Sequence, residues 1–208
     1  MSTQDNEPVS RDDKTRQRII SYCWRVISER GFRKVTIEEL CAGMALSKRT
    51  FYKHFANRDA LVEALLTEIL LPKMQMLYVN LLSDDPVRTV IERHFDLLQT
   101  EVFPVLSLRL MSDIQDMMPE LWEQAVQGRA TAIELLSKTL ERGQAQGVVR
   151  PEINTDVLSR VVQRIVISVA DPHFVLSQGL SMQDLVTTMR QVVLNGLLVP
   201  DQDKEQKR

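Results

Sequence analysis

The stretch of residues 36–55 constrains the fold more than any other part of the chain. Thr36 followed by Glu39 has the spacing of a capping box, which satisfies free amides at the start of a helix. The apolar spacing that follows predicts a short helix, and Ser47 is a second capping residue. A second short helix is therefore expected over residues 48–55. Two short helices joined by so tight a turn indicate a helix-turn-helix.

The second of these helices would carry a basic, hydrogen-bonding face. Arginine can pair with the edge of guanine in the major groove, and threonine can contact a thymine methyl group or a phosphate. Tyrosine, lysine and histidine suit phosphate oxygens. The alternative is an ordinary charged helix face in water. On the DNA-binding interpretation, the expected contact residues are Thr36, Ser47, Lys48, Arg49, Thr50, Tyr52, Lys53 and His54.

The run LSKRTFYKHFANRDAL resembles the signature of the tetracycline-repressor (TetR) family of bacterial transcription regulators. The resemblance extends from about Lys14 to Leu66 and implies an all-helical homodimer with a small DNA-binding domain and a larger ligand-sensing domain. It also adds Arg58, at a position where the family places a phosphate-contacting basic residue. The chain departs from the family at Ala45, where glycine is usual, so the turn is expected to be strained or differently shaped.

Charge is distributed unevenly along the chain. The net charge is −2, but residues 11–60 carry a net charge of +6 and the remainder carries −8. A basic N-terminal quarter on an acidic body is typical of a protein that binds double-stranded DNA through one domain.

Other classes of protein are disfavoured by what the sequence lacks. The two cysteines, Cys23 and Cys41, fall among apolar helical positions, which favours reduced core thiols over a disulfide framework or a redox sensor. No apolar run is long enough to span a bilayer, and the polar N-terminus has no signal-peptide pattern. We therefore expect a cytoplasmic protein without membrane contact, without a cofactor and without a metal site.

Helical periodicity continues along the rest of the chain and predicts an all-α fold. Pro72 should break or kink the helix that begins after Asn57. The expected body helices cover residues 86–102, 105–113, 119–142, 154–169 and 181–197. The expected domains are a disordered segment (1–11), a DNA-binding domain (12–72, motif about 35–54), a ligand-binding and dimerisation domain (73–200) and a flexible tail (201–208).

The breaks at Phe103-Pro104 and Met118-Pro119 should open space between body helices. Methionine fills irregular cavities, and pockets in helical bundles are mostly apolar with few polar groups. Ordinary core packing is the alternative. The expected ligand-pocket residues are Leu70, Met74, His94, Phe103, Arg109, Met111, Met118 and Trp122.

The last two long helices are more apolar than a surface helix should be. Burial within one chain is one explanation, and the family resemblance favours a four-helix bundle shared by two subunits. The expected dimer-interface residues are Val161, Ile165, Val169, Val186, Met189 and Val193.

Two classes of function remain at this stage. The leading one is a transcriptional repressor, not an enzyme, that leaves a palindromic operator when a small-molecule effector binds. The alternative is a helical ligand-binding protein or enzyme whose basic N-terminal patch binds another anion. The chain shows no glycine-rich phosphate loop, no metal-ligand spacing and no catalytic constellation, which disfavours the alternative.

Overall fold

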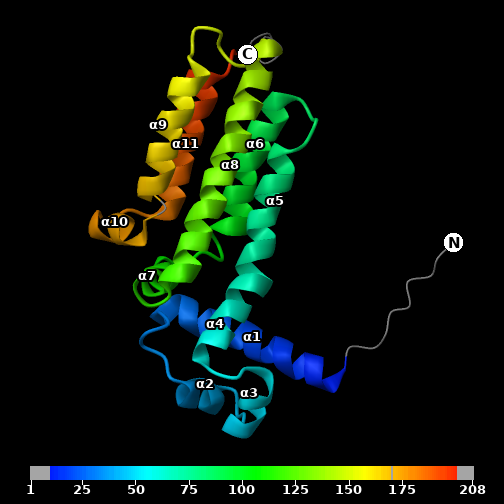
Figure 1. Ribbon diagram of the computed structural model, residues 1–208, viewed down its shortest axis with the longest axis vertical. Coiled ribbons are helices and arrows are strands. Elements are labelled where there is room, and N and C mark those ends of the chain that lie inside the picture. Colours follow the sequence, from blue (N-terminus) through cyan, green and yellow to red (C-terminus); the bar gives the residue numbers. More distant parts are fainter. Residues whose placement is uncertain (1–9, 170, 201–208) are drawn as a thin grey trace, which may run out of the picture.

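The computed structural model describes residues 10–169 and 171–200. Its helices form a small N-terminal group, called here the head (α1–α4), and a long upright bundle, called the body (α5–α11) (Figure 1). The expected all-α fold with a helix-turn-helix is confirmed. The elements are α1 (Arg11–Arg30), α2 (Ile37–Gly43), α3 (Lys48–His54), α4 (Arg58–Leu65), a π-helical segment (Leu66–Leu70), α5 (Leu71–Leu81), α6 (Val87–Leu97), a second π-helical segment (Leu98–Val102), α7 (Leu108–Met117), α8 (Pro119–Ala145), α9 (Thr155–Val169), α10 (Pro172–Ser177) and α11 (Met182–Leu197).

Capping residues set the helix boundaries of the head. Thr36 and Glu39 form the complete capping box before α2. Ser47 accepts a hydrogen bond from the Thr50 amide at 3.0 Å and so caps α3. Gly31 ends α1 with a φ of 83°, a conformation that glycine adopts without strain. Residues 10 and 11 were expected to be disordered, but Ser10 caps α1 and Arg11 begins it.

One apolar cluster holds the head together and extends into the body. Its members from α1, α3 and α4 include Ile19, Phe51 and Leu61, which are almost completely buried. Leu110 and Ile114 of α7 belong to the same cluster. Since burying a large apolar side chain contributes roughly 1.5–3 kcal/mol, these two residues fix the head firmly against α7.

The connection from head to body is a continuous helical rod. Pro72 was expected to break or kink it, and instead the rod passes through a π-helical segment just before the proline. The Leu71 amide bonds to the Leu66 carbonyl, five residues back. Proline has no amide hydrogen and its ring crowds the preceding turn, so the wider spacing relieves that crowding. The second π-helical segment lies two residues before Pro104, where the α6 rod ends as expected.

Parts of the body differ from the sequence prediction. The helix expected at 105–113 is α7, which begins later because Ser107 caps it, with Oγ accepting from the Leu110 amide. A short helix, α10, begins at Pro172, between the helices expected over 154–169 and 181–197. Asp85, just before α6, does not cap that helix, because its carboxylate pairs with Arg93.

The far end of the body closes on a second apolar cluster. Val87, Leu140 and Val149 are its most buried members, and Leu198 joins it through an isolated antiparallel bridge to Val149. Gly143 permits the close approach, because a Cβ atom there would lie 2.5 Å from a Val149 methyl carbon. The last long helix is thereby tied to the rest of the body.

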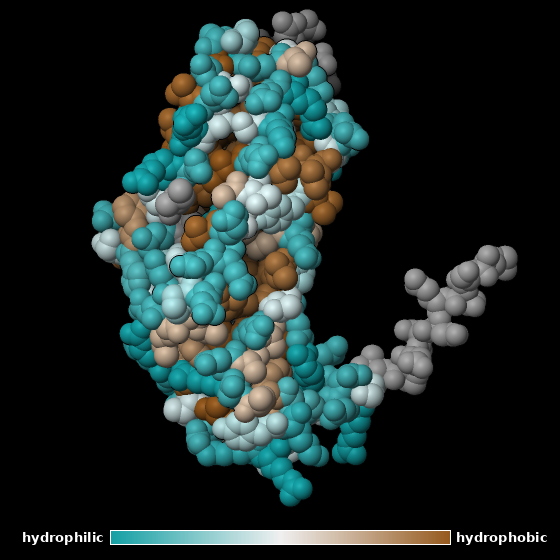
Figure 2. Space-filling model, in the orientation of Figure 1, coloured by the Kyte–Doolittle hydropathy of each residue, from teal (hydrophilic) through white to brown (hydrophobic). Residues whose placement is uncertain are grey.

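Hydrophobic side chains are also exposed on the body, as Figure 2 shows for one face. On α9 and α11 the most exposed hydrophobic residues are Val157 (57%), Val161 (48%) and Val192 (62%).

Among the described residues, no helix is long and apolar enough to cross a membrane.

The expected dimer-interface residues divide into two groups. Val161 is exposed, and Ile165 and Met189 are half-buried. Val186 is buried within the chain, and Val193 packs on the second apolar cluster, so neither fits the expected interface. The side chain of Val169 lies outside the described residues.

Candidate nucleic-acid interface and cavities

The turn between α2 and α3 is held by backbone hydrogen bonds and by one unusual residue. The Leu46 amide bonds to the Cys41 carbonyl at 2.9 Å. Ala45 has a φ of 48°, the left-handed conformation in which glycine is usual. Gly43 lies directly against Tyr22 of α1, where a Cβ atom would be 1.8 Å from the tyrosine oxygen. The turn is thus strained at one residue and closely packed at another.

Helix α3 presents a basic face to solvent. Its buried side is occupied by Phe51, which together with Phe55 packs in the head core. The outer side carries Lys48, Arg49, Tyr52 and Lys53, all exposed, with Ser47 beside them and Thr50 half-buried. This grouping is suited to a major groove, with donors for bases and phosphates on one surface.

Lys48 also connects the two helices of the motif. It forms an ion pair with Glu38 of α2. The hydrogen bond with Glu38 raises the pKa of Lys48, and the same contact lowers the pKa of Glu38. The ion pair between Lys48 and Glu38 must break before Lys48 can contact a base. Arg49 has no ion-pair partner among the described residues. Arg49 is therefore the best-placed group for direct readout.

Two expected DNA contacts point into the head instead. The His54 side chain is 4% exposed, and its Nε2 lies 3.6 Å from an Asp12 carboxylate oxygen. The guanidinium of Arg58 lies over the Phe32 ring, 4.0 Å from its centre. Both expectations are corrected in this conformation, because buried groups cannot reach phosphate. The spacing of His54 three residues after Phe51 places it on the buried side, which is a signal the sequence did contain.

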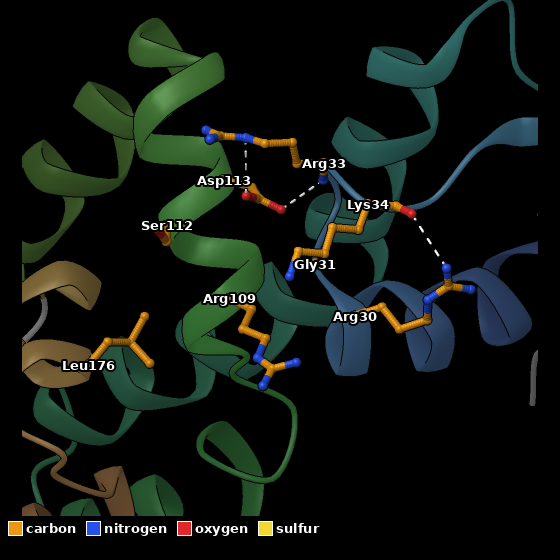
Figure 3. Close-up of a pocket in the computed structure, with 8 residues that line it drawn as sticks. All are labelled: Arg30, Gly31, Arg33, Lys34, Arg109, Ser112, Asp113 and Leu176. Carbon is orange, nitrogen blue, oxygen red and sulfur yellow. Dashed lines mark hydrogen bonds and ion pairs between the residues drawn. The ribbon is translucent and has the colours of Figure 1, made fainter.

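The head and body are also joined by polar contacts at a junction between α1 and α7 (Figure 3). The Arg33 amide donates to Asp113 at 2.8 Å, and the Arg33 guanidinium pairs with Asp116 at 2.7 Å. The Gly31 position has no room for a side chain, since a Cβ atom would lie 2.8 Å from Asp113. Nε2 of His173, at the start of α10, lies 3.1 Å from Asp116. No local pattern in the sequence predicts these contacts, because they join residues far apart in the chain.

Further contacts strengthen the same junction. Arg109 donates to the Glu29 carbonyl at 2.9 Å, and Ser107 donates to the Ser28 carbonyl at 2.7 Å. On the other side of the head, Arg16 pairs with Glu68 in the first π-helical segment at 2.5 Å. Two routes therefore connect the head with the body, one through the helical rod and one through α7.

A cavity of about 300 Å³ lies at this junction. It is polar and strongly basic, and Arg109, expected in an apolar ligand pocket, belongs to it. The lining residues are Arg30, Gly31, Arg33, Lys34, Arg109, Ser112, Asp113 and Leu176 (Figure 3).

A second cavity, of about 270 Å³, lies in the body between α7, α8 and α9, with Asp171 at one edge. Trp122 lines it, as expected for the ligand pocket. The remaining expected pocket residues do not line either cavity, and three of them are placed elsewhere by their contacts. Met111 and Met118 pack against the head core, and His94 is a half-buried residue of α6 whose Nδ1 atom is buried without a hydrogen-bond partner among the described residues. Burial lowers the pKa of His94 to about 4.

Comparison with known proteins identifies the fold and the motif. Residues 19–65, which span most of the head, match the family model described as bacterial regulatory proteins, tetR family. The regulator UidR of Escherichia coli (strain K12) is 24% identical over 149 residues, which cover 71% of this chain and 76% of UidR. This chain belongs to the TetR family of transcriptional regulators.

Two further transcriptional regulators are similar to this chain along almost the whole length. The uncharacterised regulator YvaF of Bacillus subtilis (strain 168) is 21% identical over 188 residues, which cover 89% of this chain and 97% of YvaF. A transcriptional regulator from Saccharomonospora viridis, solved in complex with choline, superposes with a TM-score of 0.67 at 19% identity. That match covers 90% of this chain and 99% of the other. The body of this TetR-family protein thus has the fold of solved regulators.

Proposed function

We propose that this TetR-family regulator represses transcription by binding a palindromic operator as a homodimer, and that a small-molecule effector releases it. The observation that carries the DNA-binding part is the exposed face of α3, with Lys48, Arg49, Tyr52 and Lys53 on one surface and Phe51 anchoring the other. Phosphate contacts would position this helix, and Arg49 would read a base.

Dimerisation is supported by the apolar side chains that α9 and α11 leave exposed. Val157, Val161 and Val192 are each about half or more exposed. A two-fold axis beside these helices would bury them in a four-helix bundle and place two heads for two half-sites.

Effector control is supported by the way the head is held. Leu110 and Ile114 of α7 lie in the head core, and Asp113 and Asp116 of the same helix hold Arg33. A ligand that moves α7 would therefore move the head. That the Saccharomonospora viridis regulator of this fold was solved with choline supports a small-molecule site in the body.

The deciding experiment is footprinting on the DNA that flanks the gene of this protein. We expect two protected patches related by two-fold symmetry, with centres about one helical turn (roughly 34 Å) or a multiple of it apart. A gel shift at increasing salt should show a steep loss of affinity, because phosphate contacts release counterions. A single asymmetric patch, or a protein that sediments as a monomer at micromolar concentration, would contradict the proposal.

A further inference from the structure

We propose that the cavity between α7, α8 and α9 binds a small organic carboxylate, with Arg129 as the partner of its carboxylate group. This inference rests on the proposed function, because it assigns the chemical class of the effector and the route by which the effector acts. Nothing in the comparisons assigns a ligand to this chain.

One wall of the cavity is a stripe along α8. Trp122, Val126, Arg129 and Ile133 follow one another at spacings of four, three and four residues, so they lie on one face of the helix. Three of these four side chains are apolar. A hydrocarbon or aromatic body would lie against them, with the guanidinium beside it. At about 270 Å³, the cavity suits a ligand with a single ring or a branched chain.

Arg129 is a partly buried cation without an ion pair. No carboxylate lies within salt-bridge distance of it among residues 10–169 and 171–200. Its guanidinium lies over the Trp122 ring, 4.7 Å from the centre, and burial lowers its pKa. A desolvated guanidinium that lacks an acid is a strong anchor for a carboxylate, which can accept two parallel hydrogen bonds from it.

Gln115 supplies the second recognition group. Its Oε1 atom is buried and accepts no hydrogen bond from the described residues. A buried acceptor without a donor is costly, so a ligand N–H or O–H group at this place would be favoured. The ligand that fits this cavity therefore has an anionic group at Arg129, a hydrogen-bond donor at Gln115 and an apolar body between them.

Asp171 is the remaining charge at the cavity, and it explains how binding would reach the head. Its carboxylate caps α10, accepting from the His173 amide at 3.0 Å. Asp171 also attracts Arg129 from a distance. A bound carboxylate would neutralise Arg129 and weaken that attraction. Helix α10, which Asp171 caps, carries His173. The imidazole of His173 contacts Asp116, and Asp116 also pairs with Arg33 of the head.

Binding can be measured directly through Trp122. The chain has two tryptophans, so a Trp24→Phe variant leaves Trp122 as the single fluorophore. The probes are benzoate, 4-hydroxybenzoate and phenylacetate, each compared with its neutral amide and with benzylamine. We expect the carboxylates to change the Trp122 fluorescence saturably and to raise the melting temperature by linkage. 4-Hydroxybenzoate should bind more tightly than benzoate, because it carries a hydroxyl donor on the far side of the ring from its carboxylate.

Substitutions then test the assigned residues. Arg129→Gln should weaken carboxylate binding by about tenfold or more, since a hydrogen bond to a charged group contributes that much. Arg129→Lys should keep part of the affinity. It serves as a second variant in case Arg129→Gln does not fold. Arg160→Gln, an exposed arginine on α9, is the matched control and should bind as wild type does. Asp171→Asn should still bind the carboxylates but should transmit less of the effect to the DNA-binding head.

The outcomes separate this inference from the proposed function. The inference is overturned if none of the carboxylates binds saturably at millimolar concentration. It is also overturned if the amides bind equally well, if benzylamine is preferred, or if both Arg129 variants keep the wild-type affinity. Operator binding is measured on the same protein without probe, and its absence overturns the proposed function alone. Carboxylates that bind through Arg129 without lowering operator affinity support the site and overturn its role as the effector switch.

Discussion

Nε2 of His173 lies 3.1 Å from one carboxylate oxygen of Asp116, and the other oxygen of Asp116 lies 2.7 Å from the guanidinium of Arg33. One carboxylate therefore joins three segments, because His173 lies in the first turn of α10, Asp116 lies in the last turn of α7 and Arg33 follows α1 in the head. All three side chains are partly exposed, so this contact is suited to being broken and remade.

Asp116→Asn should loosen the head without unfolding it. The hydrogen bond from His173 is the largest cause of the lowered pKa of Asp116. Its contribution to stability is therefore present above the unfolded pKa near 3.8 and is lost as the pH falls through the lower folded value. At neutral pH we expect faster amide exchange over residues 28–34 in this variant. Asp96→Asn, which removes a similar surface pair with Arg190, is the control and should leave those amides unchanged.

Arg49 and Lys53 should affect DNA binding in different ways. Arg49→Ala should cost roughly 1–3 kcal/mol at the operator and relax the preference at one base position. Lys53→Ala should weaken operator and random DNA alike and reduce the salt slope by about one. Titrations of both DNAs at several salt concentrations distinguish these outcomes. Equal losses of Arg49→Ala on both DNAs would show that Arg49 contacts only the backbone.

The exposed valines of α9 and α11 should be essential for dimerisation. In the proposed dimer, Val161→Glu or Val192→Glu would bury an unpaired carboxylate, which is strongly unfavourable. We expect monomers by sedimentation and loss of specific DNA binding. Val79→Glu changes an equally exposed valine on α5 and should remain dimeric. Dimers of unchanged affinity in the α9 and α11 variants would place the interface elsewhere.

Ala45→Gly should stabilise the protein. A non-glycine residue in the left-handed conformation costs roughly 1–2 kcal/mol, whereas glycine costs about 0.5–1 kcal/mol in chain entropy. The expected net gain in unfolding free energy is about 0.5–1 kcal/mol, measured by denaturant unfolding. Ala42→Gly, three residues earlier within α2, is the control and should destabilise by about 1 kcal/mol. Destabilisation by both changes would mean that the strain at φ 48° is negligible.

His94 should make stability depend on pH. Burial lowers its pKa from 6.5 to about 4, so the unfolded chain binds a proton first as the pH falls. Unfolding free energy should therefore decrease from pH 6.5 downwards, by an amount on the order of 3 kcal/mol at about pH 4. His94→Leu removes the ionisable group and should flatten this part of the curve. An unchanged slope in His94→Leu would assign the pH dependence to other groups.

Local signals in the sequence predicted the head well, because capping residues and turns act over three or four positions. Thr36, Ser47 and Asn57 each cap the helix that they were expected to cap. The face that a long helix buries depends on what packs against it, and no local signal reports that. Val186 was therefore expected at the dimer interface, although it is buried within one chain. Arg33 and Asp116 are 83 positions apart, and the helical periodicity of the sequence does not predict that they pair.

The π-helical segment before Pro72 fixes the rotational phase of the head about the axis of the rod. A π turn holds one more residue than an α turn over the same stretch of hydrogen bonds. If the same residues were wound as an ordinary α-helix instead, the head would be turned by about 100° about the rod, and the rod would be longer by about 1.5 Å. The α3 face would then point about a quarter-turn away from its present direction. In a symmetric dimer both heads would be turned by the same amount about their own rods, so neither a different half-site spacing nor a longer operator could restore the contact.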